Sequence, residues 1–256
     1  MKLEIINPLP KEGLFFKLFD FLRPVITDDV IIYAKPEYLW ISGMDASHAI
    51  LAQLKIEKNF FDGYQVNEVV KAEVLCSPVE ELEKLFKAFS KFKRVLVESS
   101  GGKLNFSSTT EKKEKKMSIP LFDTEETEPP NPVVEFKTVI QLDADDFHSE
   151  IKDALLVGND IRLKTEGINF TMTSKNESGG SYENVWRTGE DMSVLMSEPA
   201  NSEFPGDQLE EITRAGKALS NKVQISLGTG IPIKLTYIAD HIVATYFEAP
   251  MLAGDQ

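Results

Sequence analysis

The chain repeats one pattern four times, and this repetition limits its fold more than any other feature of the sequence. Each unit begins with apolar residues at spacings of three and four, as in an amphipathic helix, and continues with two short strand-like segments joined by a turn. The helix candidates span residues 10–23, 77–92, 143–158 and 205–220. The strand pairs begin near residues 30, 94, 160 and 222, so successive units lie 64, 66 and 62 residues apart. Such even spacing indicates a repeated supersecondary unit.

The ends of the helix candidates have local physical causes. Pro10, Pro78 and Pro205 lie near helix starts, where a missing backbone N–H leaves no hydrogen bond unmade. We expect Asp143 to cap the third helix with its carboxylate. We expect Gly158 to end that helix, because glycine readily adopts the left-handed conformation found at helix ends. Further strand-like segments lie at residues 49–56, 63–75, 182–190 and 241–250.

The segment PLFDTEETEPPNP, residues 120–132, separates the four units into two pairs. It is acidic, rich in proline and without periodicity, so we expect an extended surface linker. The sequence thus predicts an α+β fold with two similar domains, residues 1–119 and 133–256, each with two helices packed on antiparallel sheets. The first strand of the second domain is expected to begin near Val133.

The composition is that of a globular protein with a hydrophobic core. Of the 256 residues, 42% are hydrophobic, yet no apolar run approaches the roughly 20 residues that a membrane-spanning helix needs. The N-terminus lacks the apolar segment of a signal peptide. Cys76 is the only cysteine, which excludes an internal disulfide and a cysteine-based zinc site. We therefore expect an intracellular, soluble protein with no membrane partner.

The segment MDASHAILAQL raises the question of catalysis, because it brings Asp45, Ser47 and His48 together in the sequence. A catalytic triad needs side chains that converge in space, whereas neighbouring residues at a strand end point to opposite sides. His48, His148 and His241 are scattered without the spacing of a metal site, and the chain has no phosphate-binding or dinucleotide motif. The sequence therefore predicts a protein that is not an enzyme and uses no cofactor or metal.

Three stretches of the chain share their order and character with one known family. They are MDASHAILAQL, the terminal stretch IPIKLTYIADHIVATYFEAPML with its aromatic-X-Ala-Pro ending, and the proline-rich connector. They resemble, in that order, the signature segment, the last strand pair with the C-terminal tail, and the interdomain connecting loop of the proliferating cell nuclear antigen family, the sliding DNA clamps of archaea and eukaryotes. The resemblance covers essentially the whole chain, in register with the four units.

This resemblance implies the DNA clamp fold, with an N-terminal clamp domain (1–119), an interdomain connecting loop (120–132) and a C-terminal clamp domain (133–256). Three subunits would close into a ring with helices lining a central hole and sheets outside. Duplex DNA would pass through the hole, and the ring would tether DNA polymerase, the clamp loader and other replication and repair proteins. Such a protein is expected in the cytoplasm of an archaeon or the nucleus of a eukaryote.

The resemblance also implies which basic residues face DNA, where non-specific positive charge suits a protein that slides. They are Lys11, Lys17, Arg23, Lys84, Lys87, Lys91, Lys152, Arg214 and Lys217. The net charge is −13, so these residues can attract DNA only if they gather on one face. The third helix departs from the family, since Ser149 and Leu156 stand where basic or polar residues are usual. We expect weaker DNA-facing charge in the second domain.

A pocket for short docking peptides of client proteins is the second implied site. Its residues are Met44, His48, Ala49, Leu51, Pro232, Phe247, Ala249, Pro250 and Leu252. The backbone of residues 249–253 is expected to be free to pair with such a peptide. The connector departs from the family, because its later part, TEETEPPNP, lacks aliphatic residues and only Leu121 and Phe122 stand at its start. The peptide preference therefore stays open.

The subunit joint is the third implied site. We expect a basic edge near residues 109–119 to meet an acidic edge formed by the neighbour's third helix and its strand at 181–190. The residues are Lys112, Lys113, Lys115, Lys116, Asp145, Asp146, Glu150, Asp153, Tyr182 and Val185.

One alternative function remains from the sequence: a diverged, clamp-like interaction subunit, heterotrimeric or of the checkpoint type, without an independent replication role. The sequence leaves open whether the trimer has identical subunits, which clients and loader it uses, and its source organism.

Overall fold

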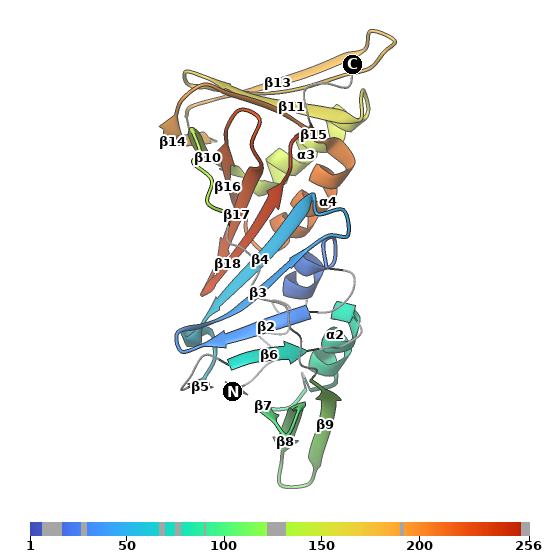
Figure 1. Ribbon diagram of the computed structural model, residues 1–256, viewed down its shortest axis with the longest axis vertical. Coiled ribbons are helices and arrows are strands. Elements are labelled where there is room, and N and C mark those ends of the chain that lie inside the picture. The colour runs from blue at the N-terminus through green and yellow to red at the C-terminus, as the bar shows by residue number, and fades with distance from the viewer. Residues whose placement is uncertain are drawn as a thin grey trace. The chain divides into compact units, whose positions relative to one another are not determined.

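The computed structural model describes residues 1–6, 17–26, 30–66, 70–74, 78–89, 91–121, 132–189 and 192–251 (Figure 1). Its contacts divide the chain into two compact units. The first unit is Met1–Pro130 with Ala239–Ala244, and the second is Asn131–Ile238 with Thr245–Gln256. Helices pack on antiparallel strands in each, so the predicted α+β class is confirmed.

Two sets of antiparallel strands form the first unit. One sheet has the order β5-β1-β7-β8-β9. Its strands are β1 (Lys2–Ile6), β5 (Gly63–Gln65), β7 (Arg94–Ser100), β8 (Lys103–Thr109) and β9 (Glu114–Pro120). The other set has the order β6-β2-β3-β4. Its strands are β2 (Val30–Lys35), β3 (Tyr38–Met44), β4 (Ile50–Glu57) and β6 (Val70–Val74), and the short 3-10 helix η1 (Lys58–Phe60) follows β4.

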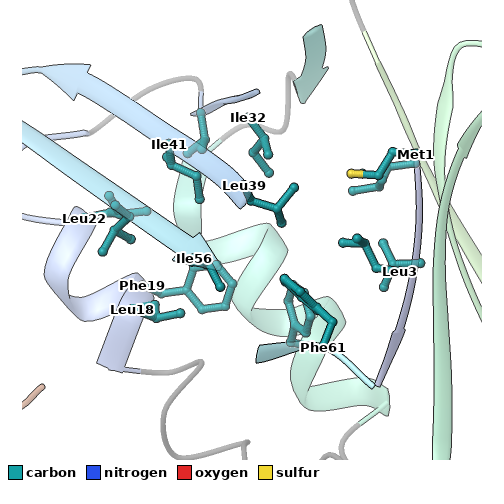
Figure 2. Close-up of a pocket in the computed structure, with 15 residues that line it drawn as sticks. Met1, Leu3, Leu18, Phe19, Leu22, Ile32, Leu39, Ile41, Ile56 and Phe61 are labelled. Atoms are coloured by element: carbon teal, nitrogen blue, oxygen red, sulfur yellow. The ribbon is translucent and has the colours of Figure 1, made fainter. Parts of the chain in front are cut away.

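Aromatic side chains join the helices of the first unit to its strands. The first helix is described over 17–22, and α2 (Pro78–Phe89) begins at a proline, whose fixed φ suits a first turn. The ring centroids of Phe19 and Phe86 lie 5.6 Å apart, and Phe86 meets Phe106 of β8 edge-on at 5.4 Å. Figure 2 shows an apolar cavity in this core. Its lining includes Met1, Leu3, Leu18, Phe19, Leu22, Ile32, Leu39, Ile41, Ile56 and Phe61.

The second unit has the same plan. One set of strands has the order β14-β10-β16-β17-β18 and the other β13-β12-β11-β15. The strands are β10 (Thr138–Asp143), β11 (Asp160–Glu166), β12 (Asn169–Lys175), β13 (Ser181–Arg187), β14 (Met192–Ser197), β15 (Ala200–Pro205), β16 (Lys222–Leu227), β17 (Ile233–Ala239) and β18 (Ile242–Glu248). The helices α3 (Ala144–Leu155) and α4 (Gly206–Lys217) lie side by side (Figure 1).

Capping and close packing hold the helices of the second unit in place. The Asp143 carboxylate accepts hydrogen bonds from the amides of Asp145 and Asp146 at 3.0 and 3.2 Å, which confirms the predicted cap of α3. In α4, a Cβ added at Gly216 would lie 2.1 Å from the ring of Tyr237 in β17. Only glycine therefore lets α4 approach the sheet this closely.

The four predicted units are present, because β2, β7, β11 and β16 begin at residues 30, 94, 160 and 222. The first strand of the second half begins later than expected: Val133 is fully exposed outside any strand, and β10 begins at Thr138. Gly158 does not adopt the left-handed conformation that we expected at the end of the third helix. It is not among the glycines with positive φ, and a Cβ there would lie 2.2 Å from the carbonyl oxygen of Lys175.

Two other expectations meet the limits of the described residues. The domain boundaries at 119 and 133 stay a prediction, because residues 122–131 of the connector lie outside the described ranges. The expected start of the first helix at Pro10 also lies outside them. Within the described ranges, no helix is long and apolar enough to cross a membrane.

Gly216→Ala tests the close packing of α4. The methyl group would overlap the Tyr237 ring, so we expect the free energy of unfolding to fall by about 2 kcal/mol in a denaturant titration. Gly189→Ala is the matched control, because a Cβ there would lie 3.9 Å from the Arg187 carbonyl oxygen, an ordinary van der Waals contact. Its effect should stay within about 0.5 kcal/mol. Equal stabilities for the two variants would contradict the packing argument.

Candidate functional site

The turn between β3 and β4 is built by Asp45. Its carboxylate accepts hydrogen bonds from the amides of Ile50 at 2.6 Å and Ser47 at 3.1 Å, and from the Ser47 hydroxyl. Burial raises the pKa of Asp45, but these hydrogen bonds outweigh it and the pKa is lowered. Asp45 and Ser47 are therefore engaged in shaping the turn, which agrees with the rejection of a catalytic triad.

His48 and Met44 are the exposed residues of the predicted peptide pocket in the first unit. His48 has a φ of 59°, in the left-handed region that few non-glycine residues adopt. Met44 is 41% exposed at the end of β3 and pairs in register with Leu51 of β4, which is buried. Ala49 is half-buried between them in the sequence.

The other predicted pocket residues lie in the second unit. Phe247 is nearly buried, with the Lys234 ammonium 5.5 Å from its ring centroid. Pro232, Ala249 and Pro250 are half-buried, and Leu252 lies outside the described residues. The tail backbone is not wholly free, contrary to expectation, since the amide of Met251 donates a hydrogen bond to the carbonyl of Glu203 at 2.8 Å.

Glu248, the last residue of β18, is a buried carboxyl that sequence reasoning missed. Its side chain is fully buried, and neither carboxyl oxygen has a hydrogen-bond partner. Burial raises the pKa of Glu248 well above its ordinary value of 4.5, because a buried carboxyl favours the protonated, uncharged form. The only sequence signal is a glutamate inside the apolar run of β18, next to Phe247 and Ala249.

The basic residues predicted to face DNA in the first unit fall into two groups. Lys17, Lys84, Lys87 and Lys91 are exposed. Arg23 is also exposed, and it holds two carboxylates, Asp20 at 2.7 Å and Glu83 at 2.6 Å, which links the first helix to α2. Lys11 lies outside the described residues.

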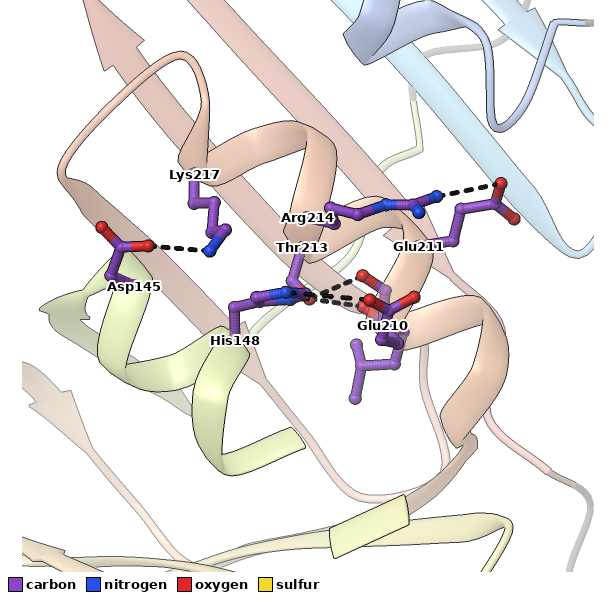
Figure 3. Close-up of polar contacts among 8 residues, drawn as sticks. Asp145, His148, Glu210, Glu211, Thr213, Arg214 and Lys217 are labelled. Atoms are coloured by element: carbon purple, nitrogen blue, oxygen red, sulfur yellow. Dashed lines mark hydrogen bonds and ion pairs between the residues drawn. The ribbon is translucent and has the colours of Figure 1, made fainter. Parts of the chain in front are cut away.

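In the second unit, the predicted DNA-facing cations of α4 are paired with carboxylates (Figure 3). The Lys217 ammonium lies 2.8 Å from the Asp145 carboxylate of α3, and the Arg214 guanidinium lies 3.6 Å from Glu211. Lys152 on α3 is exposed, as is Leu156 just after that helix. We expected little positive charge from the third helix. The pairing of Arg214 and Lys217 with carboxylates, which the sequence did not reveal, further reduces the positive charge of the second unit.

His148 joins α3 to α4 beneath these charges. Its Nδ1 lies 3.1 Å from the Thr213 hydroxyl, and its Nε2 lies 3.7 Å from Glu210 (Figure 3). Burial is the largest cause that lowers the pKa of His148, and Lys217 adds to it, so the ring is mainly neutral at pH 7. The position could have been found from the sequence, because His148 belongs to the same helical stripe as Phe147 and Ile151.

The predicted basic edge belongs to β9 and the turn before it. Lys112, Lys113 and Lys116 are exposed, and β9 is the last strand of its sheet among the described residues. Lys115 also makes contacts within its own unit. Its ammonium donates to the Ala88 carbonyl at 2.7 Å and lies 4.9 Å from the Phe89 ring centroid, so it caps the end of α2 within its own unit.

The predicted acidic edge lies beside β13, the outermost strand of the sheet β13-β12-β11-β15. The Trp186 indole donates to Asp146 at 2.7 Å, and the Tyr182 hydroxyl donates to Glu150. The pKa of Tyr182 is raised by burial first, then by the negative charges of Glu150, Asp153 and Asp146. We call these three the acidic flank.

Two other predicted residues of the joint are placed less directly. Val185 is half-buried in β13. Asp145 lies apart from the acidic flank, because its carboxylate is paired with Lys217 of α4. Within the described ranges, no group of three or more histidine, cysteine or acidic residues could hold a metal ion.

The comparisons with known proteins agree with this geometry. Residues 131–251 match the family model "Proliferating cell nuclear antigen, C-terminal domain". A "DNA polymerase sliding clamp" of Thermofilum pendens is 24% identical over 89% of this chain and 91% of its own length. The "Proliferating cell nuclear antigen" of Caenorhabditis elegans is 21% identical over 97% of each chain.

The fold is also found in a solved structure. The crystal structure of the proliferating cellular nuclear antigen from Entamoeba histolytica superposes with a TM-score of 0.79 over 98% of each chain, at 20% identity. Two units of helices on antiparallel sheets, matched along their whole length, define the DNA clamp fold. Residues 131–251 therefore match the C-terminal domain of the proliferating cell nuclear antigen family, and most of the chain is similar to sliding clamps of that family.

Glu248→Met tests the buried carboxyl. In the unfolded chain Glu248 loses its proton near pH 4.5, whereas the folded protein keeps it to higher pH. Unfolding then releases a proton, so stability falls by about 1.4 kcal/mol per pH unit between these two pKa values. Removing the group should raise the thermal midpoint at pH 8, and this gain should shrink toward pH 4.5. Glu183→Met, at an exposed position of β13, is the control and should show no such trend. A gain independent of pH would contradict a raised pKa.

Proposed function

We propose that this chain is a DNA sliding clamp, a polymerase processivity factor that encircles duplex DNA as a trimeric ring. The observation that carries the proposal is that curated relatives named "DNA polymerase sliding clamp" align with 89% of the chain. Its work is to bind and tether rather than to catalyse. A protein with this role acts in the compartment that holds the DNA, the cytoplasm of an archaeon or the nucleus of a eukaryote.

The ring closes through two unlike edges. Each subunit offers a basic edge of Lys112, Lys113 and Lys116 beside β9, and an acidic flank of Asp146, Glu150 and Asp153 beside β13. Two different surfaces that complement each other generate a head-to-tail assembly, which becomes a ring when the rotation closes. The outermost strands carry unpaired backbone groups that favour pairing, and the opposite charges fix which edges meet.

Clients dock by a short peptide with an apolar and aromatic plug. In the first unit, Met44 and His48 are exposed beside the buried Leu51, and in the second unit Pro232, Ala249 and Pro250 are partly accessible. Such a plug needs an apolar floor with a few polar groups at its rim. His48, which is exposed at a left-handed backbone position, supplies a rim group. DNA polymerase and the clamp loader are the expected clients.

One observation favours the alternative of a clamp-like interaction subunit without its own replication role. The helices α3 and α4 together carry seven acidic residues against three basic ones. DNA attracts the opposite balance. Encirclement of DNA is therefore the property that separates the two functions.

Retention on closed DNA tests the clamp proposal. After loading onto nicked circular duplex, we expect the protein to stay with the DNA through gel filtration, because a closed ring has no end to leave by. Cutting the same circles once should release it. Equal loss from circular and linear DNA would favour the interaction subunit.

His48→Ala tests the peptide pocket. Loss of a rim side chain should weaken binding of a synthetic client peptide by roughly three- to tenfold, measured by fluorescence anisotropy, with the oligomeric mass unchanged. His48→Gly separates the side chain from the backbone, because glycine removes the imidazole but suits the positive φ. His241→Ala is the matched control, a half-buried histidine outside the proposed pocket. If His48→Ala dissolved the oligomer while peptide affinity held, the assignment would be wrong.

A further inference from the structure

The helix pair of the second unit has an unusual charge balance for a surface that faces DNA. In α3, four acidic residues accompany one lysine, and in α4, three acidic residues accompany an arginine and a lysine. With His148 mainly neutral, the pair has an excess of four negative charges (seven acidic less three basic). The few cations are therefore the groups that decide how this surface meets a phosphate backbone.

Of the two cations on α4, Lys217 has the closer carboxylate partner. Its ammonium lies 2.8 Å from the Asp145 carboxylate, which comes from the neighbouring helix, and Figure 3 shows the two side chains pointing toward each other. The Lys217 side chain is 30% exposed and that of Asp145 is 78% exposed. Their hydrogen bond is the first cause of the lowered pKa of Asp145, so the carboxylate stays charged at neutral pH.

The Asp145–Lys217 ion pair has no net charge, and a phosphate group can replace the carboxylate as the partner of the lysine. An exposed ion pair contributes little to stability, so a phosphate can compete for the lysine. A cation that already has a carboxylate partner holds fewer phosphate contacts and releases fewer counterions when DNA binds.

We propose that Asp145 competes with DNA phosphates for Lys217, and that the α3–α4 surface consequently holds duplex DNA loosely. This inference rests on the proposed clamp function, because it takes the phosphate backbone of encircled duplex as the partner. Weak contacts suit sliding, since each phosphate contact that breaks and reforms resists movement along the DNA. Asp145 is a positioning residue that sets how strongly Lys217 engages.

A double-mutant cycle on Asp145 and Lys217 tests the proposal. Binding of each variant to a fluorescent duplex is measured between about 50 and 200 mM salt. Asp145→Asn should steepen the slope of log affinity against log salt by about 0.9, equal to a further three- to fourfold loss of affinity across that range. Lys217→Gln alone should change the slope little. In the Asp145→Asn background, Lys217→Gln should remove the whole gain.

Glu166→Gln supplies the matched control. It removes the same charge from a lysine pair of the same unit, since Glu166 lies 2.6 Å from Lys164 on β11, outside the helix pair. Its slope should equal that of the unmodified protein. An unchanged slope for Asp145→Asn, or an equal change for Glu166→Gln, would overturn the proposal. Retention of the unmodified protein on circular DNA separates the cases: if retention is normal, only this inference falls, and if retention is absent, both fall.

Discussion

Each helix of this chain must bury one apolar stripe against an antiparallel sheet, and the placement of every other group depends on that burial. In the second unit, Phe147 and Ile151 of α3 and Leu209 and Ile212 of α4 are fully buried. Once these stripes face the sheet, the charged residues of the same helices lie on the opposite faces and flanks. The surfaces proposed to meet DNA and the neighbouring subunit are therefore consequences of core packing.

The helix α3 shows how one amphipathic helix can serve two surfaces. One flank, with Asp146 and Glu150, is held by Trp186 and Tyr182 of the outermost strand β13. The side toward α4 carries Asp145, which holds Lys217. Its acidic residues would therefore favour a basic partner at the proposed subunit joint and oppose strong contact with DNA phosphates. The same composition would be unfavourable for DNA binding and favourable for ring closure.

The sequence predicted the features that depend on local pattern. The alternation of helix and strand pair located β2, β7, β11 and β16, and Asp143 caps α3 as expected. Features that depend on distant partners were not predictable. β1 is five residues long and pairs with β7, whose partner residues lie 88 to 96 positions away in the sequence. Likewise, the pattern marked Lys115 as basic but could not show that it caps α2 at Ala88.

The most direct test of the account is the mass of the protein in solution as salt is raised, measured by light scattering after size-exclusion chromatography. A ring joined by the basic edge and the acidic flank should have about three times the single-chain mass of 28.7 kDa at low salt. It should shift toward the single-chain mass at high salt, because screening weakens exposed charge pairs. A single-chain mass at low salt, or a trimer indifferent to salt, would contradict a joint built on opposite charges.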